Sequence, residues 1–229
     1  MLVDTLITAL CTTEYRRSAC LMLNNLSLPT ENKYTLATHE RLLPALLQLI
    51  QCNDKETHLC CLIMLNLSFD ETLDFMSTPQ FLDTMATLVS VYAPIAYSVN
   101  DRKSVESEAL KYTLGVLINI AVGLTQAIRI CMTAIPEHAI DLLHTTPNGL
   151  ERWTPNSLED CCLRLLIQMA QHDMCLPYLS KLNVDLVLYE ELDGNGGIHH
   201  MRARTLKARL DEWRSIGAGC QESPLNLLS

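Results

Sequence analysis

Ten cysteines and seven histidines are the side chains of this chain best suited to nucleophilic or metal chemistry. The cysteines fall inside apolar runs, as at Cys60-Cys61 and Cys161-Cys162, and no CxxC pair with the spacing of a zinc site occurs. His199-His200 has no third ligand at helical spacing, and no histidine combines with a serine or cysteine and an acid in a recognisable catalytic arrangement. We therefore interpret the cysteines as reduced core residues and predict no metal, no cofactor and no catalytic residues.

The stretch ELDGNGGIHHMR has several features of a calcium loop. With Glu191 at the first loop position, Asp193, Asn195 and Gly196 occupy the third, fifth and sixth positions. The twelfth position is Arg202, where a calcium loop needs a bidentate glutamate. We therefore predict a glycine-rich turn between the last two helices in place of an ion site.

Side-chain amides recur at one position of a repeated pattern. Laying SACLMLNNLSL over LCCLIMLNLSF places Asn25 on Asn66 and Ser27 on Ser68, at an offset of 41 residues. Further copies follow at successive offsets of 53, 49 and 41 and have these residues in the same position: Asn119, Gln168 and Arg209. A buried amide without partners costs about 1–3 kcal/mol. Each amide must therefore be satisfied inside the protein or point toward a ligand.

The elements that position these residues are helices. Each copy has the apolar spacing of a helix and is preceded by a second helical run, of which RLLPALLQLIQCND, with Pro44 in its first turn, is the clearest. Equivalent runs cover residues 81–92, 137–144 and 182–192, and short segments before several of them allow one or two more helical turns. Three helices in about 41 residues predict an all-α array whose units bury their apolar faces by stacking.

These units resemble armadillo repeats. That family has a small first helix, a second helix opening with an apolar-Pro-apolar run, here Leu43-Pro44-Ala45-Leu46, and a longer third helix ending in Asn-Leu-Ser or Asn-Ile-Ala. The resemblance covers about residues 1–215 and implies a right-handed α-solenoid. The implied organisation is an array of about four units over 1–198, the first incomplete, then the third helix of an atypical capping unit over 199–216 and a flexible tail over 217–229. We expect the excess residues of two units to lie between helices, around 93–103 and 145–156.

In armadillo proteins the third helices line a concave groove, and the asparagine of each one hydrogen-bonds the backbone of an extended peptide. The resemblance therefore implies a peptide-binding site made of these amides and of residues four positions away. The implied residues are Asn25, Asn66, Asn119, Gln168, Leu21, Leu62 and Asp70. A primary amide both donates and accepts, so it can hold a peptide unit without reading its side chain. In the alternative interpretation the amides bond the adjoining unit and only fix the stacking.

Nuclear-import adaptors of the armadillo family carry a tryptophan four residues before the asparagine. This chain has Leu21, Leu62, Gly115 and Arg164 at those positions. The pattern disfavours an import adaptor and favours a partner segment with apolar or mixed residues. Gly115 costs about 1 kcal/mol relative to alanine inside a helix, which indicates a close helix contact.

The formal net charge of −9 disfavours nucleic acid and favours a basic protein partner. The segment MLVDTLITAL lacks a basic region and is too short to span a bilayer, so we expect no membrane association and a cytoplasmic or nuclear location. We interpret the chain as a non-enzymatic scaffold or adaptor that holds an extended segment of another protein. The alternative is a structural subunit that self-associates, or belongs to a larger assembly, through its N-terminal helix, where an apolar face has no preceding helix to cover it. That face consists of Leu2, Leu6, Ile7 and Leu10.

Overall fold

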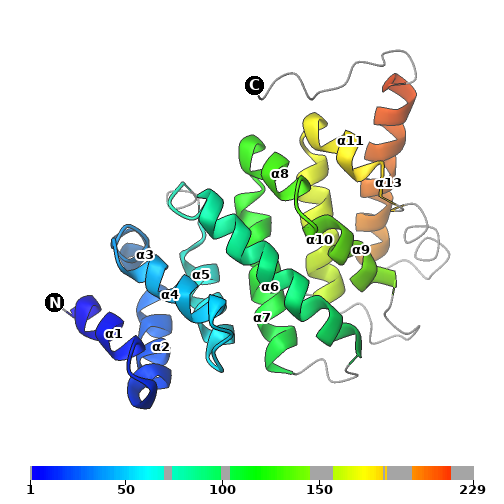
Figure 1. Cartoon of the computed structure of the whole chain (residues 1–229). Coiled ribbons are helices and arrows are strands. Elements are labelled where there is room, and N and C mark those ends of the chain that lie inside the picture. Colours follow the sequence, from blue (N-terminus) through cyan, green and yellow to red (C-terminus); the bar gives the residue numbers. More distant parts are fainter. Residues whose placement is uncertain are drawn as a thin grey trace. The chain divides into compact units, whose positions relative to one another are not determined.

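The computed structural model describes residues 2–69, 74–98, 104–144, 157–182, 184 and 198–217, and every regular element within these ranges is a helix (Figure 1). The chain divides into two compact units, Met1–Ile120 and Ala121–Ser229. The domain limits predicted at residues 198 and 217 stay predictions. Within the described part of the chain, no helix is both long and apolar enough to cross a membrane.

The first unit consists of two layers of helices. Its helices are α1 (Leu2–Leu10), α2 (Thr13–Ser27), α3 (Thr30–Ala37), α4 (Leu42–Gln51), α5 (Thr57–Leu67), α6 (Pro79–Ser98) and α7 (Val105–Ile120). Helix α5 packs between α2 and α7, so these three third helices form one layer. Helices α4 and α6 pack against each other and cover one side of that layer (Figure 1).

The second unit is built around α10, which packs against α9 and α13. Its helices are α8 (Leu124–Cys131), α9 (Ile135–His144), α10 (Leu158–Ala170), the short 3₁₀ helix η2 (Asp173–Cys175), α11 (Leu176–Leu179) and α13 (Ile198–Gly217). Helix α13 covers the span 199–216, whose role as the third helix of a capping unit stays a prediction. The predicted second helix over 182–192 and the glycine-rich turn that follows it fall almost entirely outside the described residues, as do 145–156 and 218–229.

The N-terminus of α4 follows the predicted pattern. Pro44 is the third residue of the helix, within the first turn, where its missing N–H leaves no hydrogen bond broken. The apolar stripe of the helix is buried in the unit; its members are Leu42, Leu43, Leu46, Leu47 and Ile50.

The turn after α4 is a Schellman motif. Asn53 adopts a left-handed conformation with φ of 49°, its N–H donates to Ile50 O, and the N–H of Asp54 donates to Leu49 O. The Asp54 carboxylate then accepts from the backbone N–H of Glu56 at 3.0 Å. These two residues therefore form the turn that ends α4 and leads to Glu56, the residue before α5.

Helix α6 is longer than the sequence pattern predicts. It continues through Pro94 to Ser98, so the first six residues of the expected insertion over 93–103 are helical, and 99–103 lie outside the described residues. Pro94 is exposed and removes only one hydrogen bond from a 20-residue helix, which the remaining turns tolerate.

The expectation of an uncovered apolar face on the N-terminal helix is wrong. Leu6, Ile7 and Leu10 are buried because α1 packs on α2 and α4, and only Leu2 stays exposed, at 57%. Burial of these three side chains supplies the core at this end of the unit.

The described cysteines are free thiols, and most of them lie in the core. Cys11 and Cys52 are the exceptions, because both are exposed at the ends of helices. Burial raises the pKa of the Cys61 thiol to about 12 and raises that of Cys162 well above its ordinary value. The core interpretation is therefore correct for the buried thiols and wrong for Cys11 and Cys52.

Candidate peptide-binding face

Asn66 uses both amide hydrogens inside the protein. Its Nδ2 donates to Asn24 Oδ1 and to Ser27 Oγ, each at 3.0 Å. Both acceptors belong to α2, the third helix of the preceding repeat, and Ser27 is its last residue. The Ser27 hydroxyl in turn donates to Asn24 O at 2.7 Å, so it is satisfied as donor and acceptor.

Asn119 of α7 makes a related contact with the preceding third helix, α5. Its Nδ2 donates to the backbone O of Ser68 at 2.7 Å and to Ser68 Oγ at 2.9 Å. Ser68 is the residue that ends α5, and its hydroxyl donates to Leu65 O at 2.8 Å. The last carbonyls of a helix have no partner within the helix, so Asn119 serves as a cap supplied by the next repeat.

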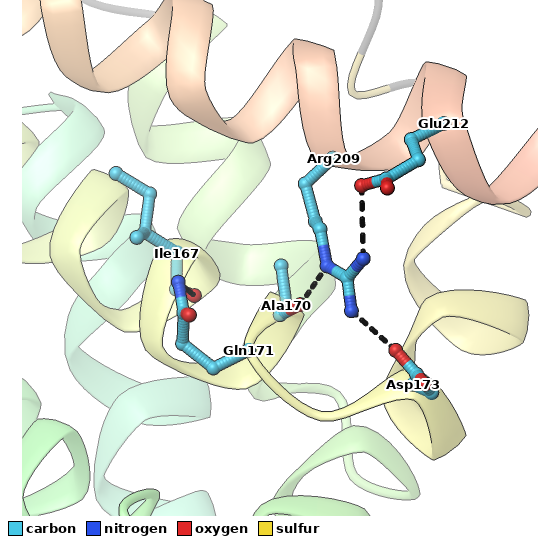
Figure 2. A network of polar contacts seen from close by, with 6 residues as sticks. All are labelled: Ile167, Ala170, Gln171, Asp173, Arg209 and Glu212. Carbon is cyan, nitrogen blue, oxygen red and sulfur yellow. Dashed lines mark hydrogen bonds and ion pairs between the residues drawn. The ribbon is translucent and has the colours of Figure 1, made fainter.

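The second unit contains an equivalent contact made by a different side chain. Arg209 of α13 donates through Nε to Ala170 O, the last residue of α10, at 3.2 Å (Figure 2). The same guanidinium forms ion pairs with Asp173 and, at 3.0 Å, with Glu212. In the aligned copies Arg209 corresponds to Asn66, and Ala170 stands where Ser27 does, so the contact has the same place in the repeat.

Gln168 does not make this contact. It is half-buried in α10, and among the described residues its side chain has no hydrogen-bond partner. His172, four residues later, places Nε2 at 2.9 Å from the carbonyl oxygen of Ala121, within the second unit. Ala121 lies two residues after Asn119, as Ser27 and Ser68 lie two residues after Asn25 and Asn66. The repeat pattern therefore predicts a contact between Gln168 and Ala121, and the structure has His172 in the place of Gln168.

The structure thus shows, for Asn66 and Asn119, the hydrogen bonds that the stacking interpretation requires. Sequence reasoning missed the partners Asn24, Ser27 and Ser68. The signal was present, because a serine follows the asparagine by two residues in both of the clearest copies.

The unburied sides of α2, α5 and α7 form what we call the third-helix face. Leu21 is 43% exposed and Asn25 is exposed on α2, whereas Leu62, Asn66 and Asn119 are half-buried on α5 and α7. The face also includes Met22, His58, Leu65, Glu108, Lys111, Tyr112 and Gly115. Five of the predicted site residues therefore lie on one set of adjoining helices. Gln168 belongs to the second unit, and Asp70 lies outside the described residues.

The amides on this face retain a restricted hydrogen-bonding capacity. Within the described residues, Oδ1 of Asn66 and Oδ1 of Asn119 accept no hydrogen bond, and the Asn25 side chain makes none at all. Because both Nδ2 groups are occupied, Asn66 and Asn119 can only accept from a ligand, whereas Asn25 can donate and accept. A peptide unit that meets Asn66 or Asn119 must present its N–H.

Close helix packing and an aromatic group shape the rest of the face. A Cβ built on Gly115 would lie 2.8 Å from Leu65 Cδ1, so glycine allows α7 to approach α5, as its position in the sequence indicates. Phe69, three residues beyond Asn66, lies beneath the Lys33 ammonium, which is 5.3 Å from the ring centroid.

No protein-family model matches the sequence, and no curated protein matches it. Solved structures do resemble it. A designed armadillo repeat protein in complex with the peptide (KR)4 superposes with a TM-score of 0.68 at 15% identity, covering 94% of this chain and 89% of that one. Two further engineered proteins match with TM-scores of 0.56 and 0.57 at 14% and 18% identity, covering 92% and 95% of this chain and 98% and 61% of theirs.

These likenesses, together with the exclusively helical described structure, define an all-α solenoid with an armadillo-like helical repeat fold. The expected fold class and the sequence resemblance are both confirmed.

Proposed function

We propose that this protein is a non-enzymatic, protein-binding scaffold that holds an extended segment of a partner along the third-helix face. The observation that carries the proposal is the alignment on adjoining helices of unpaired side-chain oxygens, Asn66 Oδ1 and Asn119 Oδ1, beside the exposed Leu21 and the half-buried Leu62. An extended segment has free backbone N–H groups to offer these acceptors and side chains to pack on the leucines.

The hydrogen bonds to the amides set register and supply little affinity. Each is worth about 1 kcal/mol net, so apolar contact with Leu21, Met22 and Leu62 must supply most of the binding free energy. Glu108 and Lys111 both lie on the face, so its local charge is mixed. The net charge of −9 favours a partner segment with basic residues at long range. The designed relative that binds (KR)4 is an armadillo protein holding a basic peptide, which supports this direction.

Selection of a random peptide library against the full chain tests the proposal. Peptides that are enriched would be labelled and titrated by fluorescence anisotropy against wild type, Leu21→Arg and the control Leu124→Arg. Leu21 and Leu124 are both exposed leucines, at 43% and 47%, but Leu124 lies on α8 in the second unit, outside the third-helix face. The expected result is at least a tenfold loss of affinity for Leu21→Arg and an unchanged affinity for Leu124→Arg. Equal affinities of the two variants would show that the third-helix face does not bind the peptide.

A further inference from the structure

A pocket separate from the third-helix face lies between α4 and α6. Its volume is about 530 Å³, within the range of about 300–1,000 Å³ that holds small organic ligands. Its walls come from the last turn of α4, the left-handed residue Asn53 and three turns of α6. The lining residues are Ile50, Gln51, Asn53, Gln80, Asp83, Thr84, Thr87, Leu88, Val91 and Tyr92.

The floor of the pocket is apolar and held in place. Ile50, Leu88 and Tyr92 are each exposed by no more than 6%, so their side chains are fixed by the core behind them. The Tyr92 hydroxyl donates to Asn53 Oδ1 at 2.5 Å, which ties α6 to the turn after α4. Burial raises the pKa of Tyr92, so this hydroxyl remains protonated and continues to donate at neutral pH.

The rim carries polar groups that the protein does not use. Within the described residues, the Asp83 carboxylate has no ion-pair or hydrogen-bond partner, and neither does the side-chain amide of Gln80. Asn53 uses only its Oδ1, and Gln51 uses only its Nε2, which donates to Thr84 Oγ1 at 3.0 Å. An apolar floor surrounded by a few unused polar groups is the usual composition of a ligand site.

The charge of the lining selects the ligand. Asp83 is its one ionisable acid, and none of the lining residues is a lysine, arginine or histidine. An anion would be repelled by the carboxylate and by the negative net charge of the chain, whereas an ammonium group is attracted by both. The apolar floor at the same time needs a hydrocarbon body, for which the Tyr92 ring is a suitable surface.

We propose that this pocket binds a small molecule consisting of an apolar body with a protonated amine, the amine against Asp83 and the body on Leu88, Val91 and Tyr92. The site is independent of the third-helix face, because its residues lie on α4, α6 and the turn between α4 and α5.

Three probes with the same apolar body, a phenyl ring on a short aliphatic chain, and different polar ends test this directly. They are 4-phenylbutylamine, 4-phenylbutanol and 4-phenylbutyrate. Each is titrated into the ¹⁵N-labelled full chain while the side-chain amide signals of Gln51, Asn53 and Gln80 are followed by NMR. For fragments of this size we expect the amine to bind with a Kd on the order of 1 mM. The alcohol should bind about three- to tenfold more weakly, and the butyrate should cause no shifts at these amides.

Substitutions test separately the contact of the amine with Asp83 and the contact of the apolar body with the rest of the pocket. Asp83→Asn should lower the affinity for the amine to that for the alcohol, whereas Glu137→Gln, which removes one exposed negative charge in the second unit, should leave it unchanged. Val91→Trp, at an exposed position on the rim, should abolish shifts with both compounds without unfolding the chain. The proposal is overturned if the amine and the butyrate bind equally, if Asp83→Asn keeps the amine preference, or if no compound shifts these signals at 10-fold above the expected Kd.

Discussion

Asn119 and Ser68 are joined by two hydrogen bonds from one side-chain amide, at 2.7 Å to the serine carbonyl and 2.9 Å to its hydroxyl. In the preceding repeat Asn66 donates to the hydroxyl of Ser27, at 3.0 Å, and to Asn24 Oδ1. The asparagines of α5 and α7 therefore each bond the C-terminal end of the third helix before their own. This is a physical reason for the asparagine to recur even where no peptide is bound.

Replacing Asn119 with alanine should destabilise the protein more than replacing Asn25. Asn119→Ala leaves the buried residue Ser68, at the end of α5, without two hydrogen bonds, at a cost of about 1–3 kcal/mol. Asn25 is exposed and has no side-chain hydrogen bond among the described residues, so Asn25→Ala should change stability by less than about 0.5 kcal/mol. Urea denaturation of both variants measures the difference, and equal midpoints would contradict the capping role.

Arg209 should stabilise the second unit through the carbonyl of Ala170 more than through its ion pair with Asp173. Asp173 is 77% exposed in that pair, and an exposed ion pair is worth about 0–1 kcal/mol and weakens in salt. Arg209→Ala removes the carbonyl contact and the ion pairs with Asp173 and Glu212, and should cost about 1–2 kcal/mol, whereas Asp173→Asn should cost less than about 0.5 kcal/mol. Urea denaturation at low and high salt distinguishes the contribution of the carbonyl contact from that of the ion pair. A loss for Asp173→Asn as large as that for Arg209→Ala would assign the effect to the ion pair.

The thiols should react with iodoacetamide in two groups. The thiolate is the reactive form, and because the pKa of Cys61 is raised to about 12, this buried thiol stays protonated and inaccessible at pH 8. Cys11 and Cys52 are exposed and should be alkylated within the native protein. Peptide mass spectrometry after native and denatured labelling gives the comparison. Alkylation of Cys61 at the rate of Cys11 without denaturant would show that the α5 core opens.

Much of the fold could be predicted from the sequence, because helical periodicity and the 41-residue offset between Asn25 and Asn66 are properties of the chain itself. The position of Pro44 and the turn at Asn53 were predictable for the same reason, since both are local. The continuation of α6 past Pro94 was not, because a proline in the pattern normally marks a helix end.

The site could be predicted only in part. In the sequence, Asn66 and Asn119 occupy the same position of the repeat. Whether their amide hydrogens face a ligand or the preceding third helix depends on distances between repeats. The contact of His172 with Ala121 was equally unpredictable from the sequence. The residue that contacts the Ala121 carbonyl is His172, four positions after Gln168, the residue that the alignment indicates. Spacing identified the helix face, and packing decided which atoms on it remain free.

The most direct test of the central claim, that Asn66 offers its oxygen to a partner while its N–H groups fix the stacking, is the affinity of a selected peptide for Asn66→Asp and Asn66→Ala. The aspartate keeps an accepting oxygen. Asn24 can donate to it by rotating its amide, and Ser27 can do so by turning its hydroxyl away from Asn24 O. The account predicts that Asn66→Asp binds the peptide within about threefold of wild type and that Asn66→Ala binds about three- to tenfold more weakly, the equivalent of one hydrogen bond. Wild-type affinity in Asn66→Ala would contradict it.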